Sequence, residues 1–565
     1  MDDPVVELAR KRFGIPYLYP YQRLVMANIL DAAEDTAAED TAAARSDEPD
    51  KPDRVRQVVI LPTGAGKSLC FQLPSLLCPG PTLVVYPLLG LMSDQLRSLE
   101  RRGIGATLLR GGQEPTERSA ALEAVRSRST PLIIANPEIL AAPAVAEALA
   151  GAGIFHFVID EAHSVAEWGD TFRPSYLELG RIAERIAPRV VTAFTATASP
   201  PVLGRLAEVL FGGVPYRLVM GSADRPNIRY EVRPALSMFR ELRRAVAESE
   251  KPLIVFVASR TGSQLLAERL RDDMPGLDTR FYHAGLSSPE RAAMERWFMD
   301  STDGVLCATC AYGMGMDKPN VRTVIHYGPS SSPEAYAQES GRAGRDGQPA
   351  AAVLIREALP SDYRGSDDRG DGSGDTIGPA NESAAGLATG PTTGAAGRKA
   401  LMAAYAASTT GCRRAFLLRV LTGDPAVSTA CSGCDACDGT AMARAPGSAE
   451  LGTLVRSHPR RFDRDGAADL LTEGHGRGLP VLREALDGWS AEEAVEAIAR
   501  ADKSGLVRVI GRGPWKGRLT VGKPASGWAC RRAGSSRSTW WAPAREPVWP
   551  SCGVSGAGDA GRHVP

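Results

Sequence analysis

The sequence lacks an excess of either charge, because its 66 lysine and arginine residues balance its 66 aspartate and glutamate residues. This balance neither indicates nor excludes a nucleic-acid partner, since local clusters of basic side chains create such surfaces. The chain also lacks any run of about 18 apolar residues, and its start, MDDPVVELAR, lacks the pattern of a signal peptide. We therefore expect a cytoplasmic protein without a membrane partner.

Cysteine is scarce, with ten residues in 565, which indicates buried thiols or a metal site instead of a disulfide framework. The length predicts roughly three to four domains. Two stretches without apolar periodicity divide the chain. Residues 31–54 are interpreted as a solvated insertion, and residues 361–398, rich in Gly, Ser, Asp and Thr, as a flexible linker.

Short apolar runs such as VVILP, TLVVYP, LIIANP and FHFVIDE alternate with helical patterns, and the rhythm recurs after residue 250. Runs of this kind are typical of buried parallel strands joined by crossover helices. The sequence therefore predicts an α/β fold with two parallel-sheet domains in tandem.

The first apolar run leads into a glycine-rich turn, LPTGAGKS, that begins a helical pattern. Glycines let backbone N–H groups approach phosphate oxygens at a helix N-terminus. Leu61 stands where the full P-loop pattern has Gly, so the turn is a variant, and a plain glycine-rich turn is the alternative. The expected cofactor-binding residues of this turn are Thr63, Gly64, Gly66, Lys67 and Ser68. Among them, Lys67 would contact the β/γ-phosphates and Ser68 would bind Mg²⁺.

A later apolar run ends in Asp160 and Glu161. A P-loop enzyme needs carboxylates there, one for the metal and one for the attacking water. Asp160 is assigned to Mg²⁺ and Glu161 to the water, which makes ATP the expected nucleotide.

Further segments stand in the order of a superfamily 2 helicase: YPYQ (19–22), YPLLGLMSDQL, DEAH, FTATA (194–198), YHAGLSSPER, CAYGMGMDKPNVR and QESGRAGRDG (338–347). Over about residues 13–440, apart from the two low-complexity stretches, the chain resembles the RecQ family of DNA helicases, bacterial type. The resemblance implies RecA-like domains at 1–225 and 226–360 and a zinc-binding domain at 399–445.

The resemblance also implies roles for individual residues. Gln22 would contact adenine, and His163 with the FTATA threonines would relay between nucleotide and domain interface. Gln338, Arg342 and Arg345 of the second domain would face the γ-phosphate across the cleft, as an arginine finger does. Ordinary surface ion pairs are the alternative for the two arginines.

An aromatic segment follows the DEAH motif, and in the resembling family such a loop senses single-stranded DNA. Trp168, Phe172 and Arg173 match it, and bases stack on aromatic faces. The alternative is that Trp168 and Phe172 pack inward. Asp170-Thr171 departs from the family pattern.

Cys412, Cys431, Cys434 and Cys437 have a spacing that suits tetrahedral Zn²⁺, with four free thiols as the alternative. The adjacent Arg413 and Arg414 would offset the negative charge of such a centre. A second pair, Cys307 and Cys310, is also spaced C-x-x-C, but it ends a buried strand, so we interpret it as core residues.

Residues 446–522 carry helical patterns and then two short strand-like runs, which favours a winged-helix-like DNA-binding module. Trp515 lies in the turn between the runs, either as a wedge that stacks on the terminal base pair or as a cover for the hairpin's apolar base. Residues 523–565 lack periodicity and are expected to be disordered.

The resemblance therefore implies an ATP-dependent helicase that moves 3′ to 5′ on single-stranded DNA and unwinds forked duplex DNA in recombination, repair or defence. The alternative is a scaffold or strand-annealing factor that binds DNA, does not unwind it, and uses ATP as a conformational switch.

Overall fold

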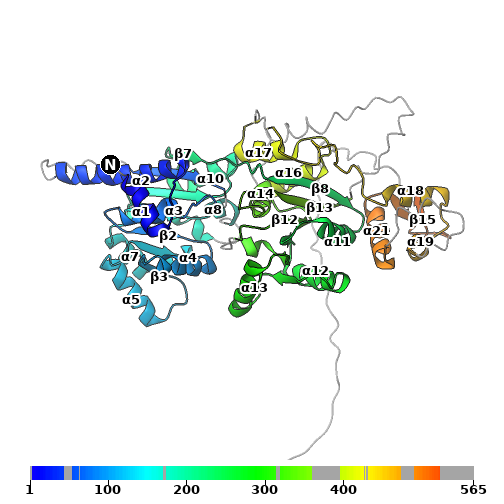
Figure 1. The fold of residues 1–565 in the computed structure, drawn as a ribbon, viewed down its shortest axis with the longest axis horizontal. Coiled ribbons are helices and arrows are strands. Elements are labelled where there is room, and N and C mark those ends of the chain that lie inside the picture. The colour runs from blue at the N-terminus through cyan, green and yellow to red at the C-terminus, as the bar shows by residue number, and fades with distance from the viewer. Residues whose placement is uncertain are drawn as a thin grey trace, which may run out of the picture. The chain divides into compact units, whose positions relative to one another are not determined.

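Two parallel β-sheets organise the computed structural model, which describes residues 3–43, 54–62, 64–168, 174–313, 318–358, 395–424, 427, 430–472 and 489–521. The first sheet has seven strands in the order β3-β4-β2-β5-β6-β1-β7. The second has six, in the order β10-β11-β9-β12-β13-β8. Figure 1 shows helices flanking the strands of each sheet. The expectation of two tandem parallel-sheet domains is confirmed.

The first domain contains α1 (Pro4–Phe13), α2 (Pro20–Ala43), β1 (Val55–Ile60), α3 (Leu69–Gln72), η1 (Pro74–Leu76), β2 (Thr82–Val85), α4 (Leu89–Arg101), β3 (Ala106–Leu109), α5 (Pro115–Arg126), β4 (Leu132–Ala135), α6 (Pro137–Leu140), α7 (Pro143–Gly151), β5 (His156–Ile159), α8 (His163–Trp168), η2 (Pro174–Tyr176), α9 (Leu179–Ile186), β6 (Val190–Thr195), α10 (Pro200–Phe211) and β7 (Arg217–Met220). Strand β6 pairs with both β1 and β5, so the segments that follow these three strands lie at one edge of the sheet.

Both faces of the first sheet are buried, as its continuous apolar runs predict. In β2, Leu83 and Val85 pack into one core cluster and Val84 into the other, because successive side chains of a strand point to opposite faces. Phe157 and Val158 of β5 divide between the clusters in the same way.

The second domain contains β8 (Ile228–Ala235), α11 (Met238–Glu248), β9 (Leu253–Phe256), α12 (Arg260–Asp273), β10 (Thr279–Tyr282), α13 (Ser288–Asp300), β11 (Val305–Ala308), η3 (Cys310–Gly313), β12 (Thr323–Tyr327), α14 (Pro333–Ser340) and β13 (Ala350–Glu357). Residues 221–227 connect β7 of the first sheet to β8 of the second.

Helix α2 continues to Ala43 and so enters the stretch interpreted as a solvated insertion. Ala32 is buried against the first-domain core beside Ile29. Alanine is the most frequent residue of this stretch and has the highest helix propensity, which allows the helix to extend without an apolar face of its own. Residues 44–53 lie outside the described residues.

Two helices follow the second domain, α16 (Ala395–Ala407) and α17 (Arg413–Thr422), together with the cysteine-rich turn at 431–437. Tyr405, Leu417 and Cys434 belong to the same core cluster as Tyr230 and Tyr336 of the second domain. Cys434 also forms an isolated parallel bridge with Tyr230. The segment at 399–445 therefore shares the core of the second domain and has no separate one among the described residues. The predicted linker lies outside those residues, except that 395–398 begin α16.

The last described part contains α18 (Ser448–Ser457), α19 (Arg464–Thr472), α21 (Ala491–Lys503), β14 (Val507–Val509) and β15 (Leu519–Val521). The two strands form an antiparallel hairpin. Helices and hairpin share one core that includes Leu454, Ile498 and Val507. This arrangement of helices with a hairpin is the one that the sequence pattern favours, and the predicted tail at 523–565 lies outside the described residues.

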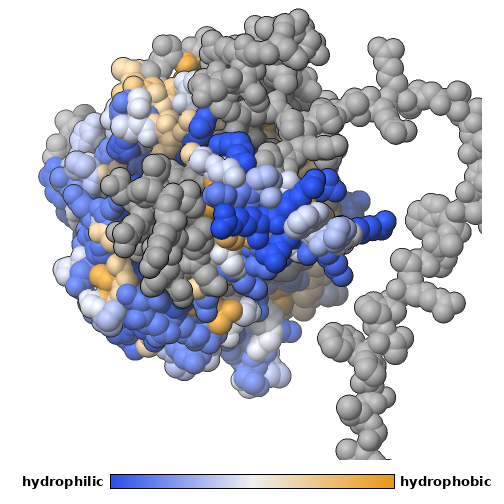
Figure 2. Space-filling model, turned by 90° about the vertical axis from the view of Figure 1, so that its right-hand side faces the viewer, coloured by the Kyte–Doolittle hydropathy of each residue, from blue (hydrophilic) through white to orange (hydrophobic). Residues whose placement is uncertain are grey.

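The face shown in Figure 2 is mostly hydrophilic among the described residues, and hydrophobic residues gather there only in small groups. None of the helices in the described ranges combines the length and the apolar character needed to cross a bilayer.

Candidate functional site

The glycine-rich turn after β1 places two glycines in the left-handed region of backbone conformation. Gly64 has φ +86° and Gly66 has φ +76°, in the region that favours glycine. A Cβ atom at Gly66 would lie 2.6 Å from Gln22 Nε2, so no larger residue fits there without moving Gln22. Ser68 precedes α3 and is the residue at its N-terminal cap. Thr63 lies outside the described residues.

Gln22 on α2 connects the start of the chain to this turn. Its Nε2 donates to the Ala65 carbonyl oxygen at 3.0 Å, and its Oε1 accepts from the Tyr19 backbone N–H at 2.9 Å. The side chain is almost fully buried. The structure thus brings the residue predicted to contact adenine to the glycine-rich turn.

The DEAH carboxylates lie beside the same turn because β1 and β5 both pair with β6. Lys67 Nζ is 3.8 Å from Glu161 Oε1. The Asp160 side chain accepts from the Glu161 backbone N–H at 2.9 Å. Burial and the neighbouring Glu161 charge raise the pKa of Asp160 to about 6, against the opposing charge of Lys67.

The negative charge of Glu161 is stabilised by positively charged side chains of both domains. Burial acts to raise the pKa of Glu161, but the positive charges of Lys67, His163, Arg342 and Arg345 outweigh it and lower that pKa. The carboxylate is therefore the form that the site stabilises.

His163 and the FTATA motif are in direct contact. His163 Nδ1 lies 3.1 Å from Thr195 Oγ1 and 3.4 Å from Glu161 Oε2. The Thr195 hydroxyl donates to the Thr197 carbonyl oxygen at 2.8 Å. A polar chain therefore runs from the DEAH carboxylate to the residues after β6.

The second domain supplies the two arginines of GRAGR. A Cβ atom at Gly64 would lie 4.0 Å from Cγ and Cδ of Arg345, which places Arg345 against the glycine-rich turn. Arg342 is buried, and this burial together with the charge of Arg345 lowers the pKa of Arg342 to about 10. Gln338 lines a small cavity of about 40 Å³ with Thr197 of the first domain. The structure brings all three predicted second-domain residues to the site.

The aromatic segment after the DEAH motif falls mainly outside the described residues. Trp168 ends α8, and its side chain is not described. Phe172 and Arg173 lie in the undescribed stretch 169–173. Their assignment to DNA remains a prediction.

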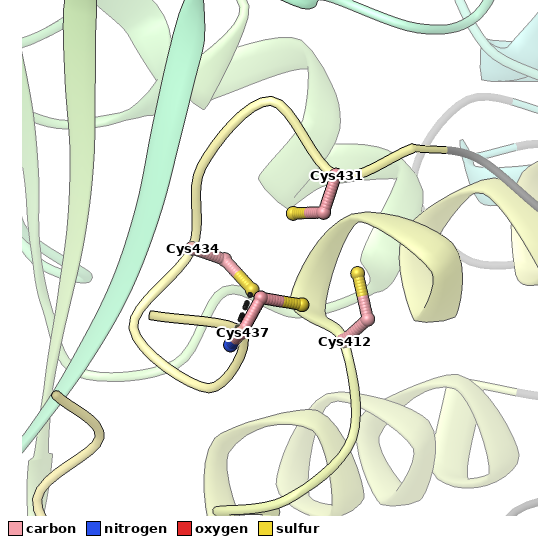
Figure 3. A group of neighbouring side chains, drawn as sticks. All are labelled: Cys412, Cys431, Cys434 and Cys437. Atoms are coloured by element: carbon pink, nitrogen blue, oxygen red, sulfur yellow. Dashed lines mark hydrogen bonds between the residues drawn. The ribbon is translucent and has the colours of Figure 1, made fainter. Parts of the chain in front are cut away.

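Cys412, Cys431, Cys434 and Cys437 converge, as Figure 3 shows, with their sulfur atoms all within 4.8 Å of one another. Cys412 caps α17, and the other three lie on the turn at 431–437. Four thiolates around Zn²⁺ at about 2.3 Å would have sulfurs roughly 3.8 Å apart, which this arrangement can reach with small shifts.

Backbone amides reinforce the cluster. The Ala415 N–H donates to Cys412 Sγ and the Cys437 N–H to Cys434 Sγ, both at 3.4 Å. Burial and hydrogen bonds with the other three thiols raise the pKa of Cys437. Four thiolates at this distance repel one another, so the donor set suits a cation that offsets their charge.

Arg413 and Arg414 do more than offset the charge of this cluster. Arg414 does lie against Cys431. However, each arginine also has a carboxylate partner, since Arg413 Nε is 2.8 Å from Asp435 Oδ1 and Arg414 pairs with Asp224. Both guanidinium groups are buried ion-pair members: Arg413 joins α17 to the turn at 431–437, and Arg414 joins α17 to the connection at 221–227.

The two cysteines of the second C-x-x-C pair differ in burial. Cys307 is fully buried in β11, as expected of a core residue, and burial raises the pKa of its thiol to about 12. Cys310 is exposed at the start of η3, so its prediction as a core residue is wrong, because the chain turns toward the surface after β11. In the described part of the chain, neither belongs to a metal-ligating group.

Trp515 is 48% exposed at the turn between β14 and β15. The turn is closed by the Gly517 N–H, which donates to the Ile510 carbonyl oxygen at 2.8 Å. Both interpretations of Trp515, the wedge and the cover for the hairpin's apolar base, stay predictions. Whether the ring contacts DNA stays a prediction.

Two contacts between segments remote in sequence were not anticipated. The Ser199 hydroxyl, at the start of α10, donates to Glu334 Oε1 of α14 at 2.5 Å, and both residues are buried. Arg225 donates three hydrogen bonds to the GRAGR loop. No local pattern marks these residues, because their partners lie more than a hundred positions away.

Two family models match the chain. The DEAD/DEAH box helicase model matches residues 19–205, and the helicase conserved C-terminal domain matches residues 237–347. These ranges contain the glycine-rich turn and DEAH motif in the first case and the GRAGR loop in the second.

Curated relatives resemble the same region. Probable ATP-dependent DNA helicase RecS of Bacillus subtilis is 38% identical over 310 residues, covering 54% of this chain and 61% of that protein. ATP-dependent DNA helicase RecQ of Pasteurella multocida is 38% identical, covering 54% and 48%. The Synechocystis RecQ is 36% identical, covering 55% and 66%. The chain thus spans between about half and two thirds of the length of these relatives.

Among solved structures, the DEAD-box helicase Mss116 bound to ssRNA and UDP-BeF has a TM-score of 0.50 and 18% sequence identity. The match covers 64% of this chain and 74% of Mss116. At this identity the likeness shows the two-domain fold alone.

Proposed function

Residues 19–347 form the paired helicase domains of a chain that resembles the RecQ family, and from that premise we propose that the protein is an ATP-dependent DNA helicase. In this proposal ATP hydrolysis drives 3′ to 5′ movement along single-stranded DNA and separation of the duplex ahead. A cytoplasmic location and a role in recombination, repair or defence belong to the same proposal.

The observation that carries the proposal is the position of Arg345. This second-domain side chain lies against Gly64 of the first domain, and its charge helps to lower the pKa of Glu161. A site shared by two domains couples hydrolysis to domain motion, because the cationic side chains reach the transferred phosphoryl group only in the closed arrangement. Such coupling is what a motor requires.

The residues present fit a nucleotide with Mg²⁺. Asp160 and Ser68 would hold the metal, which neutralises charge on the phosphates when bound. Lys67 would contact the phosphates, and Glu161, kept ionised by the surrounding cations, would orient and deprotonate the attacking water. Gln338, Arg342 and Arg345 would stabilise the charge that develops on the γ-phosphate.

We extend the proposal to one structural Zn²⁺ on Cys412, Cys431, Cys434 and Cys437, supported by the convergence of the four sulfurs. The metal would join the N-terminus of α17 to the turn at 431–437. Such a site contributes folding free energy directly.

The proposed DNA contacts are Trp168, Phe172 and Arg173 after the DEAH motif, and Trp515 on the hairpin. Support for Trp515 is its exposure beside Arg512, Lys516 and Arg518, since aromatic and basic side chains together suit nucleic acid. The substrates would be single-stranded and forked duplex DNA.

A strand-displacement assay tests the proposal. The protein with ATP and Mg²⁺ should release the labelled strand from a 3′-tailed duplex, but not from a 5′-tailed or blunt duplex. A protein that hydrolyses ATP yet releases no strand, or that accelerates annealing of complementary strands, would support the scaffold or annealing alternative instead.

A further inference from the structure

Arg225 lies in the connection between the two sheets, after β7 and before β8. Its guanidinium donates to the carbonyl oxygens of Gly341 at 2.9 Å, Ala343 at 3.0 Å and Gly344 at 3.0 Å. All three carbonyls belong to the GRAGR loop (341–345), which carries Arg342 and Arg345. One interdomain side chain therefore contacts the main chain on both sides of Arg342.

The three carbonyls follow the end of α14, where a helix leaves backbone acceptors without intrahelical donors. A guanidinium satisfies several of them at once, and its positive charge suits a helix C-terminus. Asn227, from the same connection, also donates to Gly344 O and to Gln348 O at 2.8 Å each. The loop is thus held by side chains of the connection.

A side chain of α17 in turn donates hydrogen bonds to the main chain of the connection and of β8. Arg414 donates to the Arg225 carbonyl oxygen at 2.9 Å and to the Ile228 carbonyl oxygen at 2.6 Å. Its side chain is 1% exposed. At the other end of α17, a Cβ atom at Gly423 would lie 2.3 Å from Pro200 Cγ of the first domain. Helix α17 therefore contacts both the interdomain connection and the first domain.

From these contacts we infer that Arg225 is a positioning residue for ATP hydrolysis, which sets the backbone from which Arg342 and Arg345 reach the first domain. This inference rests on the proposed function. Arg225 is more than a fold-stabilising residue in this scheme, because its three acceptors all belong to the loop that bears the charged groups of the site. Its loss should lower turnover far more than nucleotide affinity.

The test uses the full chain with its metal content verified, and compares wild type with Arg225→Gln and Arg225→Lys. A displacement of the loop by about 1 Å is enough to lower kcat for DNA-stimulated ATP hydrolysis roughly 10- to 100-fold. We expect that loss in Arg225→Gln, with KM for ATP within about twofold. Arg225→Lys, which keeps the charge but contacts fewer carbonyls, should recover part of kcat.

Arg229→Gln is the matched control, because Arg229 follows on the same segment but pairs with Glu231 and Asp438 instead of the loop. Its kcat should stay near wild type. Arg225→Gln should keep its zinc content and stay folded at the assay temperature, even where the loss of hydrogen bonds lowers its thermal midpoint, which separates positioning from loss of the fold. If Arg225→Gln does not fold, Arg225→Lys carries the same comparison.

A mutant cycle gives the decisive comparison. If Arg225 acts through Arg342 and Arg345, adding Arg225→Gln to a variant that carries both Arg342→Ala and Arg345→Ala should cause no further loss of kcat. Multiplicative losses, or equal changes in kcat and KM that follow the thermal midpoint, would overturn the inference. Failure of the proposed function is distinguishable, because in that case the wild type itself would show no DNA-stimulated ATP hydrolysis.

Discussion

Glu161 adopts a backbone conformation that few residues other than glycine adopt, with φ at +49°. The conformation follows β5 directly and brings the carboxylate toward Lys67 while its N–H contacts Asp160. Strain of this kind persists where the surrounding structure supports it, and it is frequent at functional sites. At the scale of single residues, the candidate site thus depends on local backbone geometry as much as on side-chain identity.

Lys67→Ala and Glu161→Gln should each lower ATP turnover by about 100-fold or more, because each removes a group that the proposed mechanism assigns to the transferred phosphoryl group or to the attacking water. Turnover is measured by phosphate release with saturating single-stranded DNA. The control is Lys11→Ala, whose side chain is 71% exposed on α1. Near-normal turnover in folded Lys67→Ala protein would refute the nucleotide assignment.

Trp515→Ala tests the hairpin residue. Since the ring is about half exposed, its removal should leave the free energy of unfolding within about 0.5 kcal/mol of wild type. As a wedge, Trp515 would lose stacking worth roughly 1–3 kcal/mol per base, so strand displacement should slow several-fold while DNA-stimulated ATPase persists. Unchanged displacement would place the wedge elsewhere. Lys516→Ala, which removes a neighbouring charge and no ring, is the comparison.

At the scale of elements, strand β5 buries a titratable side chain. His156 is fully buried and lies 2.8 Å from Thr192 Oγ1 of β6 through Nε2. Burial lowers the pKa of His156 from 6.5 to about 3. The unfolded chain therefore binds a proton there below pH 6.5, whereas the folded chain binds it only near pH 3.

The contribution of neutral His156 to the free energy of unfolding is present in full above pH 6.5 and is lost as the pH falls toward 3. Between pH 7 and pH 5 the loss should be roughly 2 kcal/mol. We expect His156→Gln, which retains a hydrogen-bonding side chain but does not titrate, to show a smaller fall in the free energy of unfolding over this range. Equal slopes would contradict this account. Asp160, whose pKa is raised to about 6, titrates in both proteins and cancels in the comparison.

The junction of α17 with the turn at 431–437 predicts one tightly bound zinc per chain. Cys434→Ser should lose the metal or bind it weakly, and the thermal midpoint should fall, because Cys434 also packs into the core of the second domain. Metal content is measured by elemental analysis. Cys310→Ser, at an exposed cysteine outside the cluster, should keep the metal. A stable, metal-free wild type would end the zinc assignment.

At the scale of the whole molecule, the last helical module is joined to the second domain by ion pairs and by apolar packing, since Leu236 and Ala358 belong to its core cluster. Glu493 of α21 is 2% exposed, with Arg240 at 3.6 Å and Arg243 at 3.5 Å. Its neighbour Glu492 is 88% exposed. Breaking a buried ion pair is costly, because it leaves uncompensated charge, whereas an exposed pair contributes little.

Glu493→Gln should therefore destabilise the docked module by about 3 kcal/mol, and Glu492→Gln by less than about 0.5 kcal/mol. Glutamine retains the acceptor of the capping box at Ser490, so the loss reports charge and not the cap. Hydrogen exchange of α21 and α11 measures the effect. Equal exchange in the two variants would show that the ion pairs do not hold the module.

Much of the site could be predicted from sequence because its parts are local. The turn TGAGKS and the pair Asp160-Glu161 each follow an apolar strand, and the parallel pairing of β1, β6 and β5 brings them to one edge. The convergence of the four cysteines followed from spacing in the same way. The exposure of Cys310 did not, since a C-x-x-C spacing does not tell where the chain leaves the core.

By itself the sequence determined the two parallel sheets, the glycine-rich turn, the DEAH motif and the grouping of Cys431, Cys434 and Cys437, because periodicity and short motifs specify backbone geometry within a few residues. Only the tertiary structure decided that Arg225 holds the GRAGR loop, that Ser199 meets Glu334, and that residues 399–445 share the core of the second domain. An arginine or serine can accept many partners, and its choice depends on which distant carbonyl or carboxylate the folded chain brings within hydrogen-bonding distance.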